Sequence, residues 1–394
     1  MADKQFISYN NLAQHPYVSE EISSEIEKGY WADSLFDFYT GTGADRIIRQ
    51  FKVTDLRPFT ARLKGKSYGS GTRGNANIAD NLDSIDWYAR TLITEPISNG
   101  YESEIDLYSN TKQIDFVKEC KENLIQWFAE QSDRHILANL SNDLTNVVCA
   151  SAAAANGVHA YNQGDDVKAM CAKVSAGDIC SVQSIRRLIF CAKNGIGLDG
   201  KESFVIKPTK VTTRNIGDVQ FNSKVYMLFI DSYQAEQLKS DPEWREIQAV
   251  NHNQGYEHAF YTGFLGKIDN CWIVELPTWS REQAGLLHSE VDEDMFASFV
   301  NKDAPLKPLS DYRGDKQATS IGLLLGASAC IYANNGNVRL LTQKTDLNRK
   351  TMVGGDKILG VRKAVFDAIK SGQNHNSIYH GKDFGVIGYI TSKE

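Results

Sequence analysis

The sequence predicts an α+β fold, in which helices and strands follow one another without regular alternation. The 394 residues are 42% hydrophobic and 23% charged, so the chain can bury a large core in two or three structural units. A stretch of nearly thirty residues from position 110 has apolar residues at helical spacing, and shorter runs elsewhere alternate as strands do. Together these three observations exclude a disordered chain and a regular βαβ repeat.

Charge and hydropathy narrow the function classes further. There are 43 basic and 49 acidic residues, and the resulting net charge of −6 is unfavourable for a dedicated nucleic-acid binder. The longest nearly uncharged apolar stretch, Ile321–Ala333, has thirteen residues, whereas a membrane span needs about twenty. Met1–Gln5 lacks the features of a secretory signal. We therefore expect a soluble protein made in a cytoplasm, with no membrane partner.

Residues 1–50 are expected to form an extended arm with one helical piece around Glu20–Lys28. An aromatic cluster follows and leads to the turn Gly41–Gly43; its members are Tyr30, Trp31, Leu35, Phe36, Phe38 and Tyr39. The segment has too little pattern to close a core of its own. Its aromatic side chains are expected to dock elsewhere on this chain or on a neighbouring one.

The next segment, from Phe51 to about Asn110, is predicted to be a long β-hairpin with a glycine-rich tip at Gly65–Gly74. Its charges are segregated, with seven acidic residues over Asp80–Asp106. Five basic residues and no acidic ones lie between positions 56 and 79, namely Arg57, Arg62, Lys64, Lys66 and Arg73. Either the two arms of the hairpin pair with each other or the hairpin meets a partner surface, and the sequence alone slightly favours the first.

The clearest predicted element is a helix that begins at Asn110 or Thr111 and runs to about Leu140, about 40 Å long. Further along, a helix from Asp178 to Lys193 is expected to end at Asn194-Gly195. A buried strand over Lys224–Ile230 precedes a helix over Tyr233–Leu238 and another that begins at Asp241-Pro242. The small apolar residues of Gly322–Tyr332 suggest close helix packing, and Asp383–Thr391 is expected to be a terminal strand.

No catalytic or metal site is predicted. Gly69–Gly74 fits the dinucleotide fingerprint G-x-G-x-x-G, but no apolar strand precedes it and Asn75–Asn77 does not open a helix. The seven cysteines and eight histidines lack metal-ligand spacing, and the acidic group at Glu290–Asp294 is typical of a solvated turn. No cofactor is expected. The sequence leaves open a nucleotide-binding enzyme that uses Gly69–Gly74.

The region from Arg339 to Lys370 holds eight basic residues against three acidic ones. This local excess of positive charge is compatible with phosphates as a partner. A solvated helix face with intersubunit ion pairs explains the pattern equally well. The candidate DNA-facing residues are Arg349, Lys350, Arg362 and Lys363.

Short motifs in a fixed order resemble the major capsid proteins of tailed phages with the HK97-type fold, and more narrowly the N-four-like podovirus family. The most specific is Ile230-Asp231-x-Tyr233-Gln234-Ala235-x-x-Leu238, followed by Asp241-Pro242-x-Trp244. The other matching motifs extend from residue 41 to residue 387. They are Gly41–Asp45, Leu63–Gly65, Gly69-x-Gly71-x-x-Gly74-Asn75, Leu124-x-x-Trp127-x-Ala129 with Asp133 and Leu140, Phe260–Gly266, Leu324–Ala327, Gly360-x-Arg362-Lys363 and Asp383–Ile387.

The resemblance implies a non-enzymatic protein that self-assembles into hexamers and pentamers of an icosahedral head around double-stranded DNA. It implies an N-terminal arm at 1–50, an extended loop at 51–109, a peripheral domain with the spine helix at 110–145 and 341–394, and an axial domain at 146–340. The implied partners are further copies of the chain, scaffolding and portal proteins, a decoration protein and packaged DNA. The implied location is the virion, with assembly in the host cytoplasm. A phage protein that forms tubes or rings is the remaining structural alternative.

With this resemblance, the segregated charges of the hairpin favour contact with a neighbouring subunit. The five basic residues of the hairpin become candidates for that contact. The basic residues near the C-terminus become candidates for a surface that faces DNA.

Overall fold

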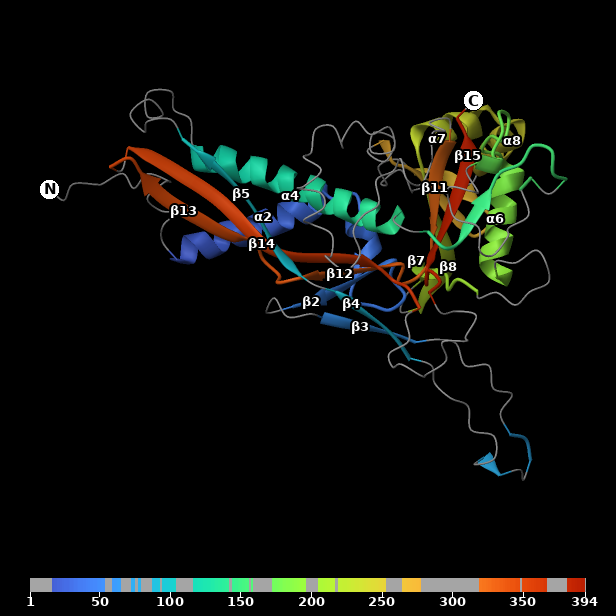
Figure 1. Cartoon of the computed structure of the whole chain (residues 1–394), viewed down its shortest axis with the longest axis horizontal. Coiled ribbons are helices and arrows are strands. Elements are labelled where there is room, and N and C mark those ends of the chain that lie inside the picture. The colour runs from blue at the N-terminus through green and yellow to red at the C-terminus, as the bar shows by residue number, and fades with distance from the viewer. Residues whose placement is uncertain are drawn as a thin grey trace.

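The computed structural model describes residues 16–53, 59–64, 72–74, 77–78, 87–92, 94–103, 116–141, 144–155, 157–158, 172–195, 205–216, 219–252, 264–277, 319–347, 349–366 and 381–393. These residues form two β-sheets with separate sets of helices, at opposite ends of an elongated molecule (Figure 1). A third, two-stranded sheet is the base of a hairpin. The mixture of helices and strands confirms the predicted α+β class.

The first sheet has the strand order β1-β2-β12-β14-β13, with β5 paired to the other side of β14. Its longest strand, β14, alternates between buried residues and partly exposed ones. Consequently one face is covered and the other is open. The strands of this sheet are β1 (Thr40–Gly41), β2 (Ile48–Lys52), β5 (Glu95–Glu102), β12 (Cys330–Asn334), β13 (Arg339–Thr345) and β14 (Lys350–Lys363).

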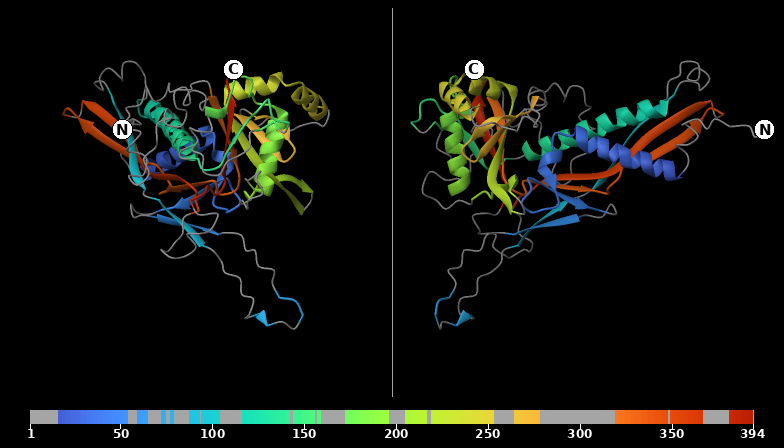
Figure 2. Two further views of the ribbon diagram at one scale, coloured as in Figure 1. Left: turned by 45° about the vertical axis from the view of Figure 1, so that its right-hand side comes forward. Right: turned by 180° about the vertical axis from the view of Figure 1, so that it is seen from behind.

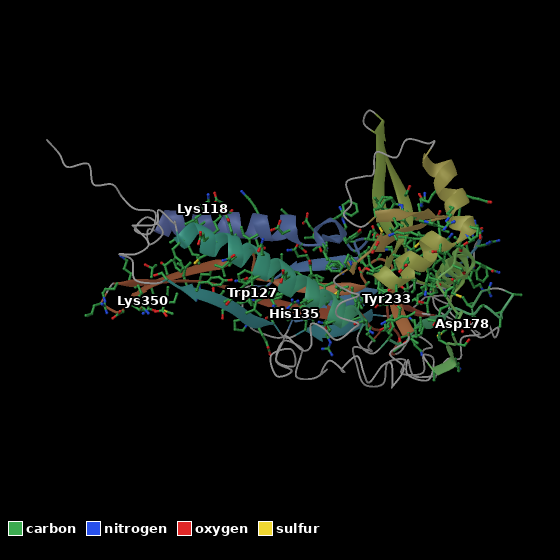
Figure 3. The ribbon with its side chains drawn as sticks, turned by 90° about the horizontal axis from the view of Figure 1, so that it is seen from above. Lys118, Trp127, His135, Asp178, Tyr233 and Lys350 are labelled. Carbon is green, nitrogen blue, oxygen red and sulfur yellow. The ribbon has the colours of Figure 1, made fainter. Side chains whose placement is uncertain are left out.

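Helices α2 (Pro16–Asp33) and α4 (Phe116–Ser141) lie side by side on the covered face of the first sheet (Figure 3). At 26 residues, α4 is about 39 Å long. A Cβ at Gly355 of β14 would lie 3.1 Å from the Phe128 ring, so a glycine there lets α4 approach closely. The long helix is confirmed. Its predicted first residues, Asn110 and Thr111, lie outside the described part of the chain.

The second sheet has the order β6-β15-β11-β8-β10-β9, with β7 paired to β8. Its strands are β6 (Val147–Cys149), β7 (Thr209–Ile216), β8 (Val219–Ile230), β9 (Phe264–Ile268), β10 (Cys271–Glu275), β11 (Thr319–Leu325) and β15 (Val386–Ser392). Every residue of β11 and β15 is buried. The accompanying helices are α6 (Val182–Asn194), α7 (Ser232–Ser240) and α8 (Pro242–His252) (Figure 1).

Two predictions about local structure were wrong. Gly322–Tyr332 forms no helix; it contributes to β11 and β12, joined by a turn. Because both faces of these strands are buried, the sequence lacks the alternation that marks a half-exposed strand. Helix α6 begins after Ser181, not Asp178. Ser181 and Ser184 form a reciprocal capping box there, while the Asp178 carboxylate accepts hydrogen bonds from the Ser175 and Ala152 amides.

The predicted hairpin is confirmed at its base. Strands β3 (Phe59–Lys64) and β4 (Trp87–Leu92) pair antiparallel, with Phe59 opposite Leu92 and Lys64 opposite Trp87. Figure 2 shows this pair on the side of the first sheet opposite α2 and α4. Ala61, Leu63 and Leu92 are buried, so the base of the hairpin packs on the body of the molecule.

Three strands pair across the segments that the sequence assigns to separate domains, whose boundaries stay a prediction. Strand β5 lies in the predicted extended loop and β12 in the predicted axial segment, yet both pair within the first sheet. Strand β15 lies in the predicted peripheral segment but pairs with β11 and β6 of the second sheet. The chain therefore passes between the two sheets several times.

Candidate functional site

The basic residues predicted for subunit contacts lie on or near the hairpin. Arg62 is exposed on β3, and its carbonyl accepts a hydrogen bond from the Arg49 guanidinium. Arg73 is also exposed. Lys64 is the last residue of β3. Arg57 and Lys66 lie outside the described residues, as do the first three residues of the Gly69–Gly74 motif.

The four candidate DNA-facing residues do not share one environment. Arg349 is exposed and forms an ion pair with Asp346 at 2.7 Å. Lys350 lies 3.7 Å from Glu102 on β5. Arg362 is half-buried, and Lys363 is buried. The structure therefore does not bring these residues together as one basic surface, and Lys363 is not available to DNA in the isolated subunit.

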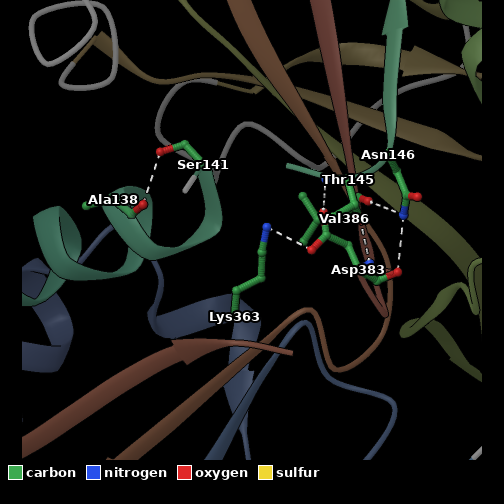
Figure 4. Close-up of polar contacts among 7 residues, drawn as sticks. All are labelled: Ala138, Ser141, Thr145, Asn146, Lys363, Asp383 and Val386. Atoms are coloured by element: carbon green, nitrogen blue, oxygen red, sulfur yellow. Dashed lines mark hydrogen bonds and ion pairs between the residues drawn. The ribbon is translucent and has the colours of Figure 1, made fainter. Parts of the chain in front are cut away.

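Lys363 instead forms a buried ion pair at the junction of the two sheets (Figure 4). Its Nζ lies 2.7 Å from Oδ1 of Asp383, a residue with no exposed surface. The Thr145 amide donates to Asp383 Oδ2 at 2.9 Å, and the Asp383 amide donates to Thr145 Oγ1 at 2.8 Å. Asn146 Nδ2 donates to the carbonyls of Asp383 and Val386. This network joins the last residue of β14 to the segments that enter β6 and β15.

A second buried ion pair fixes α2 to the first sheet. Lys357 Nζ lies 2.7 and 2.8 Å from the two carboxylate oxygens of Glu27. The Lys357 side chain has no exposed surface, and that of Glu27 is 12% exposed. Burial lowers the pKa of Lys357, and the adjacent Glu27 carboxylate opposes that change.

The segment after α2 is anchored by Asp133 on α4. Asp133 accepts hydrogen bonds from Ser34 Oγ at 2.6 Å and from the Leu35 amide at 2.9 Å. Further along, the rings of Phe36 and Tyr39 pack edge-on against Phe229 of β8, with centroids 5.6 and 5.2 Å away. Part of the predicted aromatic cluster therefore docks within this same chain.

Sequence reasoning missed Asp133 and Asp383 as structural anchors. Asp133 had a detectable signal, because it is four residues from Ala129 and three from Ile136, both buried on the same helix. Asp383 had none that identified Lys363 as its partner. The pair forms only when the two sheets come together.

Burial changes the pKa values of two residues on α4. It raises the pKa of Asp133 to about 6; the Glu130 charge adds to this rise, while the bonds from Ser34 and Leu35 oppose it. It lowers the pKa of His135 to about 4. The stabilising contribution of the Asp133 proton is complete below the unfolded value of 3.8 and is lost as the pH rises through 6. His135 has the opposite effect, because stability falls as the pH drops from 6.5 to 4.

We predict that Asp133→Asn raises the stability of the subunit at pH 7.5 by on the order of 2 kcal/mol, because an amide avoids burial of a charge. The difference should vanish near pH 4, where the wild-type carboxyl is protonated. Urea unfolding of both proteins between pH 4 and pH 7.5 measures it, and His135, common to both, cancels. A variant that is less stable at every pH would contradict the prediction.

Other kinds of site find no support among the described residues. They contain no cluster of three or more His, Cys, Asp or Glu side chains placed to hold a metal ion. None of the described helices has both the length and the hydrophobicity required to cross a membrane. The six described cysteines are buried, and burial raises the pKa of Cys120, Cys180 and Cys330 to about 12. The thiols of these three residues are therefore held protonated and unreactive.

Comparisons with known proteins agree with this architecture. Residues 22–392 match the profile of a family described as phage capsid protein. The chain is 32% identical over 404 aligned positions to the "Major structural protein ORF14" of Helicobacter pylori bacteriophage KHP30, covering 98% of each sequence.

Solved capsid structures give the same result. The acid-stable capsid of Helicobacter pylori bacteriophage KHP30 has a TM-score of 0.72 at 30% identity, covering 92% of this chain and 91% of the other. The head of bacteriophage KHP40 has a TM-score of 0.67 at 30% identity and covers 92% of each chain. The capsid of Ralstonia phage GP4, at 15% identity, has a TM-score of 0.63 and covers 90% of each chain, which supports the fold alone.

These likenesses confirm the predicted HK97-type capsid fold, and the narrower N-four-like assignment stays a prediction. The matching family is one of structural proteins. Since its profile spans nearly the whole sequence, the chain belongs to the phage capsid protein family.

Proposed function

We propose that this chain is the major capsid protein of a phage head, which self-assembles into the hexamers and pentamers of an icosahedral shell around double-stranded DNA. The observation that carries the proposal is the near full-length, 32% identity to a phage major structural protein. The protein is then part of the virion and is assembled in the host cytoplasm. Its role is structural, with no catalytic step and no cofactor.

The presence of two sheets supports two domains with different positions in this shell. The first sheet with α2 and α4 corresponds to the peripheral domain, and the second sheet with α6, α7 and α8 to the axial domain around each capsomer centre. The β3–β4 hairpin corresponds to the core of the extended loop. Strands β5, β12 and β15 are assigned by their pairing, which moves β5 out of the loop segment 51–109, β12 out of the axial segment 146–340 and β15 out of the peripheral segment 341–394.

The charged candidates remain part of the proposal. The hairpin residues Arg57, Arg62, Lys64, Lys66 and Arg73 would meet an acidic surface of a neighbouring subunit, since Arg62 and Arg73 are exposed. Arg349, Lys350 and Arg362 are the remaining candidates for non-specific contact with packaged DNA. The buried ion pair of Lys363 removes it from that group. Scaffolding, portal and decoration proteins complete the proposed partners.

Negative-stain electron microscopy of the concentrated recombinant protein, alone and co-expressed with the phage scaffolding protein, tests the proposal. Closed shells or sheets of hexamers are expected. In the same assay, glutamate at positions 62, 64 and 66 should block shells and leave a folded subunit. Tubes or open rings would favour another structural role. Small dispersed particles stabilised by a nicotinamide dinucleotide would favour the enzyme alternative at Gly69–Gly74.

A further inference from the structure

The turn between β13 and β14 carries an apolar side chain in an unfavourable position. Leu347 is 94% exposed, and both it and Asp346 have left-handed backbones, with φ angles of 54° and 51°. Glycine and asparagine tolerate this conformation better than leucine. The single chain therefore gains nothing from leucine at this turn, either in backbone conformation or in burial. Such a choice points to a contact outside the subunit.

The turn itself is firmly held. The Arg349 amide donates to the Asp346 carbonyl at 3.0 Å, and the Arg349 guanidinium pairs with the Asp346 carboxylate. The turn lies at the end of the molecule remote from the second sheet; Figure 3 marks this end by Lys350. Leu347 is thus an exposed apolar side chain on a fixed turn at one end of the fold, and we call it the knob.

The open face of the same sheet has a row in which two of three residues lack side chains, and we call this row, with the adjacent Met352, the notch. Leu341 of β13, Gly354 of β14 and Gly100 of β5 form one cross-strand row. The two glycines face each other closely, because a Cβ added at Gly100 would lie 3.4 Å from the Gly354 Cα. Met352 lies in the adjacent row, and Leu341 and Met352 are 42% and 41% exposed. Two residues without side chains therefore lie beside two partly exposed apolar residues on this face.

Charges around the notch are already paired within the chain. Arg339 and Asp356, in the row on one side, lie 2.8 Å apart, and on the other side Glu102 is 3.7 Å from Lys350. The rim therefore offers no strong charge to a partner. The notch fits an apolar side chain better than an ionic one.

We propose that Leu347 of one copy seats in the Leu341–Met352 notch of a second copy at a contact within the shell. The inference rests on the proposed function. Leu347 does not fill the notch of its own chain, because it is 94% exposed, and Leu341 lies four strand positions, about 14 Å, before β13 ends at Thr345. Knob and notch are different surfaces, so the contact is head-to-tail and forms a ring when its rotation closes, as around the centre of a capsomer. Each contact is small, but a shell repeats it in every copy.

Leu347→Asn tests the knob, because asparagine tolerates the left-handed turn while it removes the apolar side chain. The thermal midpoint of the dispersed variant subunit should equal or exceed that of wild type. The yield of closed shells should fall by about tenfold or more, since each copy loses a buried leucine. The matched control is Val205→Asn, which removes an apolar side chain that is 44% exposed in the segment before β7 and should assemble normally.

The notch is tested by a cysteine pair. A protein with both Leu347→Cys and Met352→Cys should form disulfide-linked oligomers in oxidised shells, whereas neither single variant should. The six described native cysteines are buried and should not interfere. Crosslinking by Leu347→Cys alone would show that the turns meet each other, and would overturn the notch.

The outcomes separate this inference from the function on which it rests. If wild type forms shells and Leu347→Asn forms them in equal yield, the knob is refuted while the capsid function stands. If wild type forms no shell even with its scaffolding protein, both are refuted.

Discussion

Lys363→Met is expected to destabilise the folded subunit by about 3–5 kcal/mol, because it leaves the Asp383 carboxylate buried without its counter-charge. Asp383 has no exposed surface, and the Lys363 ammonium is 2.7 Å away. Methionine fills a similar volume, so the lost interaction is chiefly electrostatic. Urea unfolding of the dispersed protein, followed by circular dichroism, gives the change.

Two further variants make the result specific. Arg339→Met removes the cation from a pair whose arginine side chain is 70% exposed, and it should cost less than about 1 kcal/mol. Adding Asp383→Asn to Lys363→Met should recover much of the loss, since no unpaired charge then remains buried. Equal losses for Lys363→Met and Arg339→Met would contradict the importance of burial at the junction.

Loss of the ion pair between Lys363 and Asp383 should also affect assembly of the shell. Lys363 ends the longest strand of the first sheet, and Asp383 precedes the terminal strand of the second. A subunit without this pair loses a fixed link between the two sheets. We therefore expect Lys363→Met shells to be fewer and less regular, even at temperatures where the subunit remains folded.

Local patterns were predictable and long-range pairings were not. The spacing of Leu124 and Phe128 among the apolar residues of α4 is sufficient to predict that helix, because helical periodicity is a property of neighbouring residues. The base of the hairpin was also predictable, because the alternation of apolar and polar residues along a strand is likewise a property of neighbouring residues. Lys363 was expected at a DNA surface because charge counting cannot detect a buried carboxylate that approaches from another sheet. Gly322 was assigned to a helix because a strand buried on both faces shows no alternation.

Of the residues proposed to contact a neighbouring subunit, some could be predicted from the sequence and others could not. Arg62 was predicted from the segregation of charge along the chain, and it is exposed as a contact residue must be. Leu347 carries no signal in the sequence, because one leucine between Asp346 and Asn348 is unremarkable. Its importance depends on the φ angle of the turn and on its exposure, which only the folded chain reveals.

Phe229→Ala is expected to cost about 3–5 kcal/mol of folding stability, the range for deletion of a fully buried phenylalanine ring. Phe229 belongs to the second sheet, whereas its partners Phe36 and Tyr39 belong to the segment that leads from α2 into the first sheet. The substitution therefore opens a cavity and also releases the anchor of the N-terminal segment.

The measurement that separates these two effects combines unfolding with limited proteolysis. Phe229→Leu restores most of the lost volume but no edge-on ring contact, so it should recover part of the stability and leave the N-terminal segment more readily cleaved than in wild type. Phe190→Ala is the matched control, because Phe190 is 47% exposed and packs against Arg187 on the surface of α6. It should change stability by less than about 1 kcal/mol. If Phe229→Ala left cleavage unchanged, the aromatic contact would contribute only to packing of the core. The ion pair between Lys363 and Asp383 would then be the main link between the two sheets.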